Sequence, residues 1–310
     1  MSSKIVLPAA IVAALLMTPV SGEAATVAMS GSDAFGASSF NAGTNWTGGG
    51  APSAGNDYVT NDFRMRTPAD GNSYTFGGDS LTVNNTNGLN GGLMYKGAGN
   101  TGVLTINNLI LDGGRIHHQN GVGDLFQLAG AINVVSDSSI HAKQGNIEIS
   151  APISGAGNLL IPATDAPAEN NRYVTLLGDN SYTGSIDVAG RFRLGDAGSL
   201  VFDIGAAGVN NSIAGTGTAE FNGAFNFALS GASTTIGDSW NIASVANQTF
   251  GDTFTVTGFN SVQGGAAWSD GTYLFDEATG VLSVIPEPTS GLMAVGGIVF
   301  AFGASRVRRG

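Results

Sequence analysis

Short β-type apolar runs, each ended by glycine, asparagine or aspartate, recur through the central part of this chain. Clear examples are SLTV (80–83), VLTINNLIL (103–111), LFQLAGAINVV (125–135) and NIEIS (146–150). No stretch between the two ends shows a sustained 3.6-residue apolar period, so helices are not expected there. The 48 glycines and the 42% of hydrophobic residues are typical of many short strands joined by tight turns, and not of a disordered chain.

Further runs of the same kind predict a loosely repeating fold. They are YVTNDF (58–63), SYTF (73–76), NLLIPA (158–163), RYVTLLG (172–178) and SIDVAG (185–190). Together the runs follow one another roughly every 10 to 25 residues, a spacing that is usual for irregular solenoid turns. One turn cannot bury its apolar face alone, but stacked turns can.

The last 26 residues, 285–310, have the order of a sorting signal. Pro286, Glu287 and Pro288 precede an uncharged, mostly apolar run, 289–305, and the chain closes with Arg306, Arg308 and Arg309. The run would span about 25 Å as a helix, near the lower limit for crossing a bilayer core, and the arginines favour the cytoplasmic side. This arrangement resembles the PEP-CTERM sorting signal of Gram-negative bacteria. The resemblance implies a transient transmembrane helix in the inner membrane and recognition by an exosortase, which would cut near Pro286–Pro288. An ordinary C-terminal anchor is the alternative.

The first 25 residues have the order of a secretory signal peptide. Lys4 precedes an apolar stretch, Ile5 to Met17, and small residues surround Ala24 and Ala25, where signal peptidase would cut. Both ends are therefore predicted to be helical targeting segments, the only parts of the chain that meet the membrane. The alternative for residues 1–25 is a retained anchor.

Residues 101–221 contain a recognisable repeat core. Gly-Asp-Asn-Ser-Tyr-Thr-Gly (178–184) lies between two strands in which Val174, Leu176, Ile186 and Val188 alternate with other residues, so each strand offers one apolar face. The segment resembles the autotransporter-associated β-strand repeat. That resemblance implies a short right-handed parallel β-helix, as in autotransporter passengers.

Both flanks of this region are predicted to be caps. Residues 26–100 hold the first strands and an N-terminal β cap with Trp46, Tyr58, Phe63 and Phe76 packed over the first turn, since an uncapped solenoid exposes strand edges. Within it, residues 40–83 resemble the entry segment of exported PEP-CTERM proteins that carry such repeats.

Residues 222–284 are predicted to form an antiparallel region with bulky core residues. TYLFDEATGVLSV (272–284) is its clearest signal, because Asp276–Gly280 separates two short strands as in a hairpin. The whole chain is thus expected to be all-β between its two targeting helices.

Charge and composition exclude several functions. The net charge is −11, with only 12 lysines and arginines, which argues against nucleic-acid binding through phosphates. The absence of cysteine removes disulfides, thiolate metal sites and cysteine nucleophiles. No cofactor motif is present: the glycine-rich stretches lack the Gly-Lys-Ser/Thr of a phosphate loop.

The candidate chemical residues have plain structural alternatives. His117 and His118, beside Arg115 and Gln119, lack further ligands at metal-site spacing and are interpreted as polar residues of a turn corner that point in opposite directions. The aspartates and asparagines of Gly178–Gly184 and Ser269–Gly271 are interpreted as turn formers, not as calcium ligands, because no EF-hand pattern or nonapeptide repeat is present. Therefore no metal site is expected.

Catalysis would need two acids in one groove. Asp112, Asp124, Asp137 and Glu148 could bring two carboxylates onto neighbouring turns, as glycan-degrading β-helices require. With so many acidic residues a chance pair is expected, so no catalytic residue is assigned. Exposed aromatic residues could instead stack on sugars, and Trp46 and Trp268 are the candidates, with core packing as the alternative.

The sequence as a whole predicts an exported structural or adhesin-like protein, located at the cell surface or in an extracellular polysaccharide matrix. Its partners would be signal peptidase and exosortase during export, and polysaccharide afterwards. The alternatives are a polysaccharide lyase or hydrolase, and a glycan-binding module, on the same scaffold.

Overall fold

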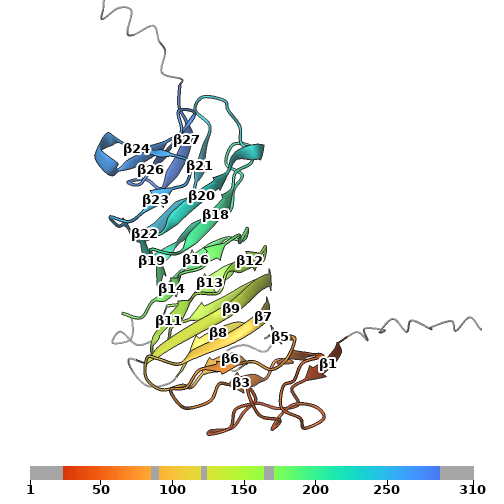
Figure 1. Ribbon diagram of the computed structural model, residues 1–310. Coiled ribbons are helices and arrows are strands. Elements are labelled where there is room, and N and C mark those ends of the chain that lie inside the picture. The colour runs from red at the N-terminus through yellow and green to blue at the C-terminus, as the bar shows by residue number, and fades with distance from the viewer. Residues whose placement is uncertain (1–23, 85–90, 120–123, 164–170, 287–310) are drawn as a thin grey trace, which may run out of the picture.

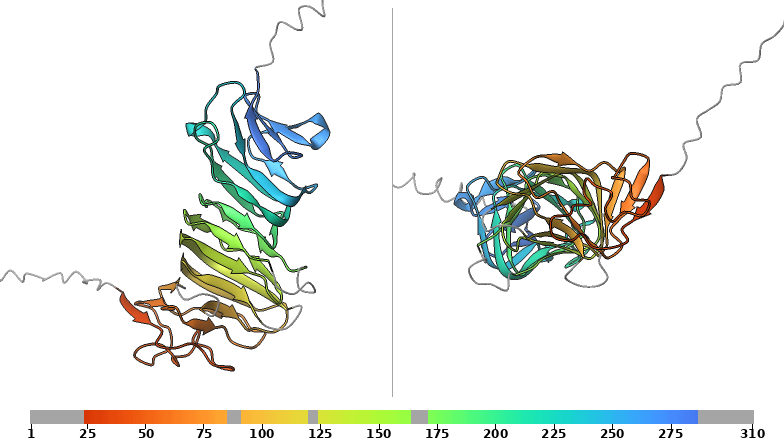
Figure 2. Two further views of the ribbon diagram at one scale, coloured as in Figure 1. Left: turned by 180° about the vertical axis from the view of Figure 1, so that it is seen from behind. Right: turned by 90° about the horizontal axis from the view of Figure 1, so that it is seen from below.

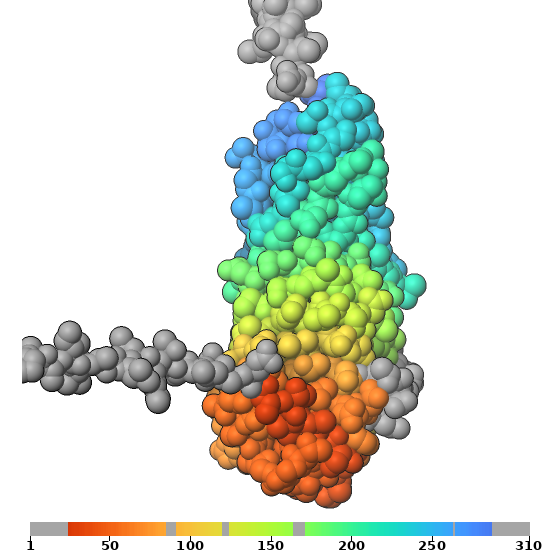
Figure 3. Space-filling model, turned by 90° about the vertical axis from the view of Figure 1, so that its right-hand side faces the viewer, coloured from red at the N-terminus to blue at the C-terminus, as the bar shows by residue number. Residues whose placement is uncertain are grey.

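The computed structural model describes residues 24–84, 91–119, 124–163 and 171–286, and these parts of the chain are all-β. Parallel strands coil into a β-solenoid of about 7 turns, as the sequence predicts (Figure 1). The view along the body in Figure 2 shows the strands enclosing one continuous interior, and Figure 3 shows an elongated body with the N-terminal residues at one end. Within these residues, no helix is long and apolar enough to cross a membrane.

The solenoid has three faces, and each is a ladder of parallel strands. Face 1 consists of β1 (Ala25–Ala28), β2 (Asn56–Val59), β5 (Ser80–Val83), the second halves of β7 (Val103–Asp112) and β9 (Leu125–Ser136), and β12 (Ile153–Gly155). Beyond β12 it continues as a separate sheet of β15 (Asp179–Asn180), β18 (Ser199–Asp203), β20 (Ala224–Ala228) and β23 (Thr255–Val256).

Faces 2 and 3 complete each turn. Face 2 consists of β3 (Arg64–Arg66), β6 (Gly92–Tyr95), β8 (Arg115–His118), β10 (Ser138–His141), β13 (Leu159–Ile161), β16 (Ile186–Val188) and the first halves of β19 (Ile213–Phe221) and β22 (Ala243–Phe250). Face 3 consists of β4 (Tyr74–Thr75), the first halves of β7 and β9, β11 (Asn146–Ile149), β14 (Val174–Leu176), β17 (Arg191–Leu194) and the second halves of β19 and β22.

The interior is a set of apolar columns that run across the turns. On face 2, Leu93 is in register with Ile116, and Ile116 with Ile140, and each is fully buried. On face 3, Phe126, Ile147, Val174 and Phe192 make a second column. Each large side chain buried in this way contributes about 1.5–3 kcal/mol of hydrophobic stabilisation. Because apolar residues stack on apolar residues from turn to turn, hydrophobic contacts join every turn to the next.

A cap closes the N-terminal end of the interior. Trp46 is 3% exposed, and its ring packs edge to face against Tyr58 at 4.8 Å and Phe76 at 6.5 Å between ring centres. The indole Nε1 donates a hydrogen bond to the Ser39 carbonyl at 2.7 Å. Phe63 packs against the same core. The predicted aromatic cap is present.

The C-terminal region differs from its prediction. Only β21 (Ser239–Asn241), β24 (Asn260–Val262), β25 (Ala267–Ser269), β26 (Tyr273–Asp276) and β27 (Val281–Val284) are antiparallel, and two 3₁₀ turns, Leu229–Gly231 and Gln263–Gly265, accompany them. β20, β22 and β23, within the predicted antiparallel range 222–284, belong to the parallel solenoid. An alternating apolar pattern marks a strand but not the direction of its partner, which explains the error. The predicted hairpin is confirmed, since β26 pairs antiparallel with β27.

Candidate functional site

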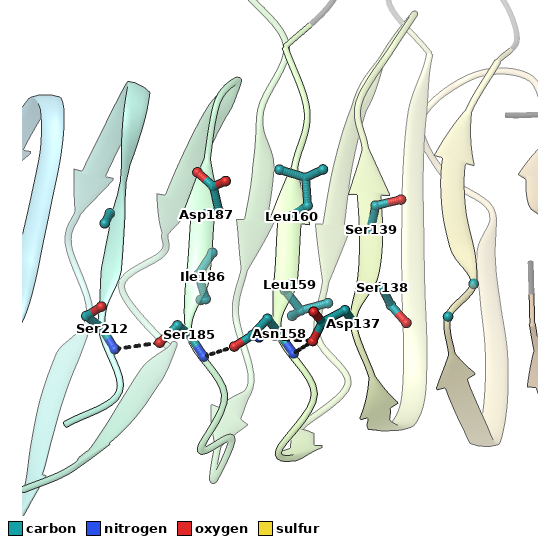
Figure 4. A pocket seen from close by; sticks show the side chains of 13 residues that line it. Asp137, Ser138, Ser139, Asn158, Leu159, Leu160, Ser185, Ile186, Asp187 and Ser212 are labelled. Carbon is teal, nitrogen blue, oxygen red and sulfur yellow. Dashed lines mark hydrogen bonds between the residues drawn. The ribbon is translucent and has the colours of Figure 1, made fainter. Parts of the chain in front are cut away.

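A groove with a volume of about 740 Å³ lies on face 2 (Figure 4). Five successive turns contribute to it, so the groove runs along the solenoid axis for roughly 20 Å, given the spacing of about 4.8 Å between neighbouring strands. Its lining is Gly113, Gly114, Asp137, Ser138, Ser139, Asn158, Leu159, Leu160, Ser185, Ile186, Asp187, Ser212 and Ala214.

One wall of the groove is a hydrogen-bonded ladder of polar corner residues. The Asn158 backbone N–H and Nδ2 donate to Asp137 Oδ1 at 2.9 and 3.0 Å. The Ser185 N–H donates to Asn158 Oδ1 at 3.0 Å, and the Ser212 N–H donates to Ser185 Oγ at 3.1 Å (Figure 4). Each corner side chain thus satisfies a backbone donor of the next turn, which holds the wall in place.

The floor of the groove is the outward row of face 2. Ser139 is in register with Leu160, Leu160 with Asp187, and Asp187 with Ala214. Leu160 is 39% exposed, and Asp187 is exposed. Hydroxyl, amide and carboxylate groups beside one exposed leucine offer hydrogen bonds and a small apolar contact. This arrangement suits an extended, hydroxyl-rich chain lying along the axis.

The four acids singled out from the sequence do not form a matched pair. Asp137 lines the groove, whereas Asp112 Oδ1 accepts a hydrogen bond from Ser136 Oγ at 2.8 Å. Asp124 Oδ1 accepts one from the Gly99 N–H at 3.0 Å, and Glu148 on face 3 is in register with Gln127 and Thr175. The second groove carboxylate is Asp187, two turns from Asp137, which the sequence reasoning missed. The spacing of 27 residues between corner residues of adjacent turns, such as Asn158 and Ser185, was the sequence signal that could have placed Asp187 at this groove.

The two adjacent histidines are both buried, at 2% and 0% exposure. Burial lowers the pKa of His117 to about 3, aided by the charge of Arg115, and burial lowers the pKa of His118 to about 4. His118 lies against the Tyr95 ring, with 4.9 Å between ring centres. Both imidazoles are therefore neutral at pH 7. No group of three or more histidine, aspartate and glutamate residues in the described ranges could hold a metal ion.

The two tryptophans proposed for sugar contact lie in different environments. Trp46 is a cap residue, and its low exposure leaves its ring no open face for a sugar. Trp268 is half-buried and lines a second hollow of about 440 Å³ with Phe250, Asp252 and Glu277. Its Nε1 donates to Glu277 Oε1 at 2.7 Å. Trp268 therefore remains a candidate sugar contact.

The polar loops interpreted as turn formers have structural roles. Asn180 Oδ1 accepts from the Ile153 N–H at 2.9 Å, while its Nδ2 donates to the carbonyls of Gly178 and Ser199, both at 2.8 Å. Asp270 Oδ1 accepts from the N–H groups of Thr272 and Tyr273 at 2.8 and 2.7 Å. These bonds use the side-chain oxygens within the fold.

An ion-pair cluster lies on face 3. Glu220 Oε2 accepts from Arg193 Nη2 at 2.5 Å, and Glu220 Oε1 accepts from the Tyr173 hydroxyl at 2.5 Å. The guanidinium of Arg193 lies 4.3 Å from the centre of the Tyr173 ring. Burial raises the pKa of Glu220, but the hydrogen bonds from Tyr173 and Arg193 lower it more, so the pKa lies below its usual value. The cluster links three turns of face 3.

The residues assigned to sorting lie mostly outside the described part of the chain. Pro286 directly follows β27 and Ile285, and it is exposed. Glu287, Pro288, Arg306, Arg308 and Arg309 are outside the described residues, as are residues 1–23. The predicted targeting helices therefore stay predictions.

Comparison with known proteins identifies no relative: no family model, curated protein or solved structure matches this chain. The resemblances drawn from the sequence motifs stay predictions, and function has to be argued from the residues of the chain itself.

Proposed function

We propose that this chain is an exported structural, adhesin-like protein of the cell surface or of an extracellular polysaccharide matrix. The observation that supports this role best is the parallel solenoid, in which apolar columns and corner hydrogen bonds join every turn to the next. Such a body is stiff along its axis, because bending it breaks several backbone hydrogen bonds at once. Its long side faces offer repeated contacts, which add through multivalency.

The route to that location is part of the proposal. Signal peptidase would remove residues 1–25, and an exosortase would process residues 285–310 at Pro286–Glu287–Pro288 while the apolar run 289–305 holds the chain transiently in the inner membrane. The right-handed coil implied by the repeat-like segment 178–184 belongs to the same proposal. Pro286, the one residue of this motif among the described residues, is exposed directly after β27.

Cell fractionation with mass spectrometry of the native protein tests this function. We expect the body in the surface or matrix fraction, without residues 1–25 and without the terminal arginines. Replacing Pro286, Glu287 and Pro288 by alanine should retain the protein in the membrane, whereas the control Ser290→Ala should be processed normally. A native product that carries Arg309 and stays in the cytosol contradicts the proposal.

A glycan-degrading enzyme is the second candidate, and the groove favours it. Asp137 and Asp187 are two acids at one hollow that an extended polymer could occupy. However, Asp187 is two turns away from Asp137 and two residues further along its strand, so their backbones are about 12 Å apart and the side chains would have to converge on the scissile bond. Screening the purified protein against polysaccharides decides between the two functions. Turnover that is lost in Asp137→Asn or Asp187→Asn would replace the structural role by an enzymatic one.

A further inference from the structure

Positive charge is concentrated in one region of this acidic protein. The described residues contain eight lysines and arginines, and five of them lie on face 2 or at its edge. We call these five the basic strip: Arg64, Arg66, Lys96, Arg115 and Lys143. All five are half-buried and belong to neighbouring turns near the N-terminal end of the solenoid.

The charge of the strip is poorly compensated. Among the described residues, Arg64, Arg66, Arg115 and Lys143 form no salt bridge, and the Nε atoms of Arg64 and Arg66 are buried without a hydrogen-bond partner. Asp33, a carboxylate whose charge acts on Arg66, is fully buried and accepts hydrogen bonds from Ser39, Asn45 and the Arg66 backbone.

The pKa directions agree with this picture. Burial and the charge of Arg64 lower the pKa of Arg66, although Asp33 opposes the change. Burial and the charges of Arg66 and Arg64 lower the pKa of Lys96, and burial lowers that of Arg115. These cations are therefore partly desolvated and repel one another. An anion placed among these cations would offset both their lost solvation and their mutual repulsion.

The strip is continuous with the groove. Along the outward row of face 2, Arg64 is in register with Gly92, and a Cβ atom on Gly92 would collide with the backbone of Arg115. Arg115 is in register with Ser139, and Arg115 Nε donates to Ser139 Oγ at 3.3 Å. Ser139 lines the groove. One row of residues thus leads from the cations into the groove, with Arg64 and Arg115 about 10 Å apart.

An exposed aromatic ring lies at the far end of the strip. Phe35 is 93% exposed, and the Arg66 guanidinium lies 5.5 Å from the centre of its ring. Phe35, Arg66 and Lys96 border a small hollow of about 200 Å³. A large aromatic side chain held open beside two cations offers a flat apolar surface to a sugar ring next to partners for its charged group.

We propose that the basic strip and the groove together bind a linear anionic polysaccharide that lies along the solenoid axis. The carboxylate or sulfate groups of the polymer contact Arg64, Arg66 and Arg115, and one sugar ring packs on Phe35. Farther along, the neutral hydroxyls of the polymer bind Ser139 and the corner residues of the groove. Asp187 accepts hydroxyl hydrogens there and disfavours a second row of anionic groups.

The chemistry favours a polysaccharide over a nucleic acid. Asp137 and Asp187 in the groove accept hydrogen bonds, and a polysaccharide presents hydroxyl donors along its whole length, whereas a DNA backbone presents none. The groove lining also contains no aromatic side chain on which bases could stack. The choice of polymer rests on the extracellular role proposed above, but binding itself is measured in vitro and is independent of how the protein is sorted.

The first test measures binding of the full-length chain to polygalacturonate, a linear uronic acid polymer. The comparison polymer is the same material with its carboxyl groups reduced to alcohols. We expect binding of polygalacturonate only, and about tenfold or greater weakening in the double variant Arg66→Gln/Arg115→Gln, because two charged hydrogen bonds to the polymer are lost. The control Arg172→Gln, a cation outside the strip, should bind as the parent does. Thermal unfolding verifies that each variant is folded.

A second measurement does not depend on variants. Carbodiimide activates the carboxylates of the bound polymer, which then form amide bonds with neighbouring lysine amines. The chain has three lysines, Lys4, Lys96 and Lys143, so peptide mapping reports the site directly. We expect coupling at Lys96 or Lys143, and its loss at high salt, where screening acts over about 3 Å.

Four results would overturn the proposal. The first is equal binding of the charged and the reduced polymer, and the second is unchanged binding by the folded double variant. The third is coupling confined to Lys4. The fourth is a single-stranded DNA oligonucleotide that binds the strip more tightly than polygalacturonate does. If the protein is found to be exported but fails these tests, only the ligand is wrong; if it binds but stays in the cytosol, only the proposed location is wrong.

Discussion

His117 and His118 are adjacent residues of β8, and both side chains are excluded from solvent. Adjacent residues of a regular strand point to opposite sides. His118 reaches the interior beside Tyr95, whereas His117 lies on the outward row between Met94 and His141. The sequence predicted opposite directions but not the burial of both rings, because burial depends on neighbouring turns.

These histidines predict a loss of stability in mild acid. Their pKa values are lowered from about 6.5 to about 3 and 4, so the folded state keeps them neutral while the unfolded chain takes up protons below pH 6.5. Above pH 6.5 the two histidines cost the folded state no stability, and the destabilisation that they cause grows as the pH falls towards 4. At pH 4.5 each histidine should cost roughly 2–3 kcal/mol.

Urea unfolding of His117→Gln and His118→Gln at pH 7 and pH 4.5 checks this expectation. Relative to the parent, each variant should lose less free energy of unfolding between the two pH values, by about 2 kcal/mol. Carboxylates titrate in parent and variant alike, so they cancel in the comparison. Parallel pH profiles would show that the rings are not held neutral.

Asp33 is the most heavily bonded carboxylate of the N-terminal cap. It is 0% exposed, and it accepts from the Ser39 N–H, the Ser39 hydroxyl, Asn45 Nδ2 and the Arg66 N–H at 2.6–2.8 Å. Because all its partners are donors, Asp33→Asn would set an amide N–H₂ against other N–H groups. We expect a loss of roughly 2–4 kcal/mol in unfolding free energy. The exposed Asp252→Asn serves as control and should change it by less than about 0.5 kcal/mol.

At the scale of elements, the positions of the strands follow from local pattern, but their partners do not. Ser80–Val83 is a strand with the predicted bounds, and the predicted runs 103–111 and 125–135 correspond closely to β7 and β9. The same alternation occurs in β20 and β22, which were expected to be antiparallel and are parallel. Parallel and antiparallel strands show the same alternation of apolar and polar residues. The lengths of the corners between strands decide which of the two pairings forms.

Asn180 shows how one side chain links elements. It is 1% exposed, and it bonds backbone groups of β12, of its own corner and of β18. Asn180→Ala would leave the Ile153 N–H without this acceptor and would remove one hydrogen bond from each of the Gly178 and Ser199 carbonyls, although the Gly178 carbonyl still accepts from the Ser199 N–H. We expect a destabilisation of roughly 2–4 kcal/mol in thermal or urea unfolding.

The matched control is Asn247→Ala, whose amide makes an exposed hydrogen bond to the Gly217 carbonyl at 3.2 Å. It should cost less than about 1 kcal/mol. Equal effects of the two substitutions would mean that the Asn180 bonds do not hold the turns together.

For the whole molecule, the two caps cover the ends of the apolar interior of the solenoid. At the C-terminal end, Phe275 of β26 is fully buried and lies within 6.1 Å, between ring centres, of Phe225, Phe227, Phe250 and Phe254. The antiparallel sheet thereby packs its core face against the last parallel turns, so that they do not present an open end to solvent.

Phe275→Ala should weaken this cap by about 3–5 kcal/mol. We also expect slow self-association of the variant in light scattering, because a loosened cap exposes strand edges. Leu274→Ala, a half-buried neighbour on the opposite side of β26, is the control. A variant that is as stable and as monomeric as the control would show that the sheet does not protect the end of the solenoid.

The sequence by itself determined that the chain is all-β between its ends, where most of its strands lie, which aromatic residues cap the first turn and where the last hairpin turns. These features are local: alternation, glycine and asparagine corners, and aromatic clusters are all read within a few residues. Only the tertiary structure decided which strands are neighbours, and therefore that Asp137 and Asp187 share a groove and that five cations lie together on face 2. Hydrogen bonds between neighbouring turns join residues 21 to 30 positions apart, as in Asn158–Asp137 and Asn247–Gly217, so the register of distant residues depends on the exact length of every corner between them.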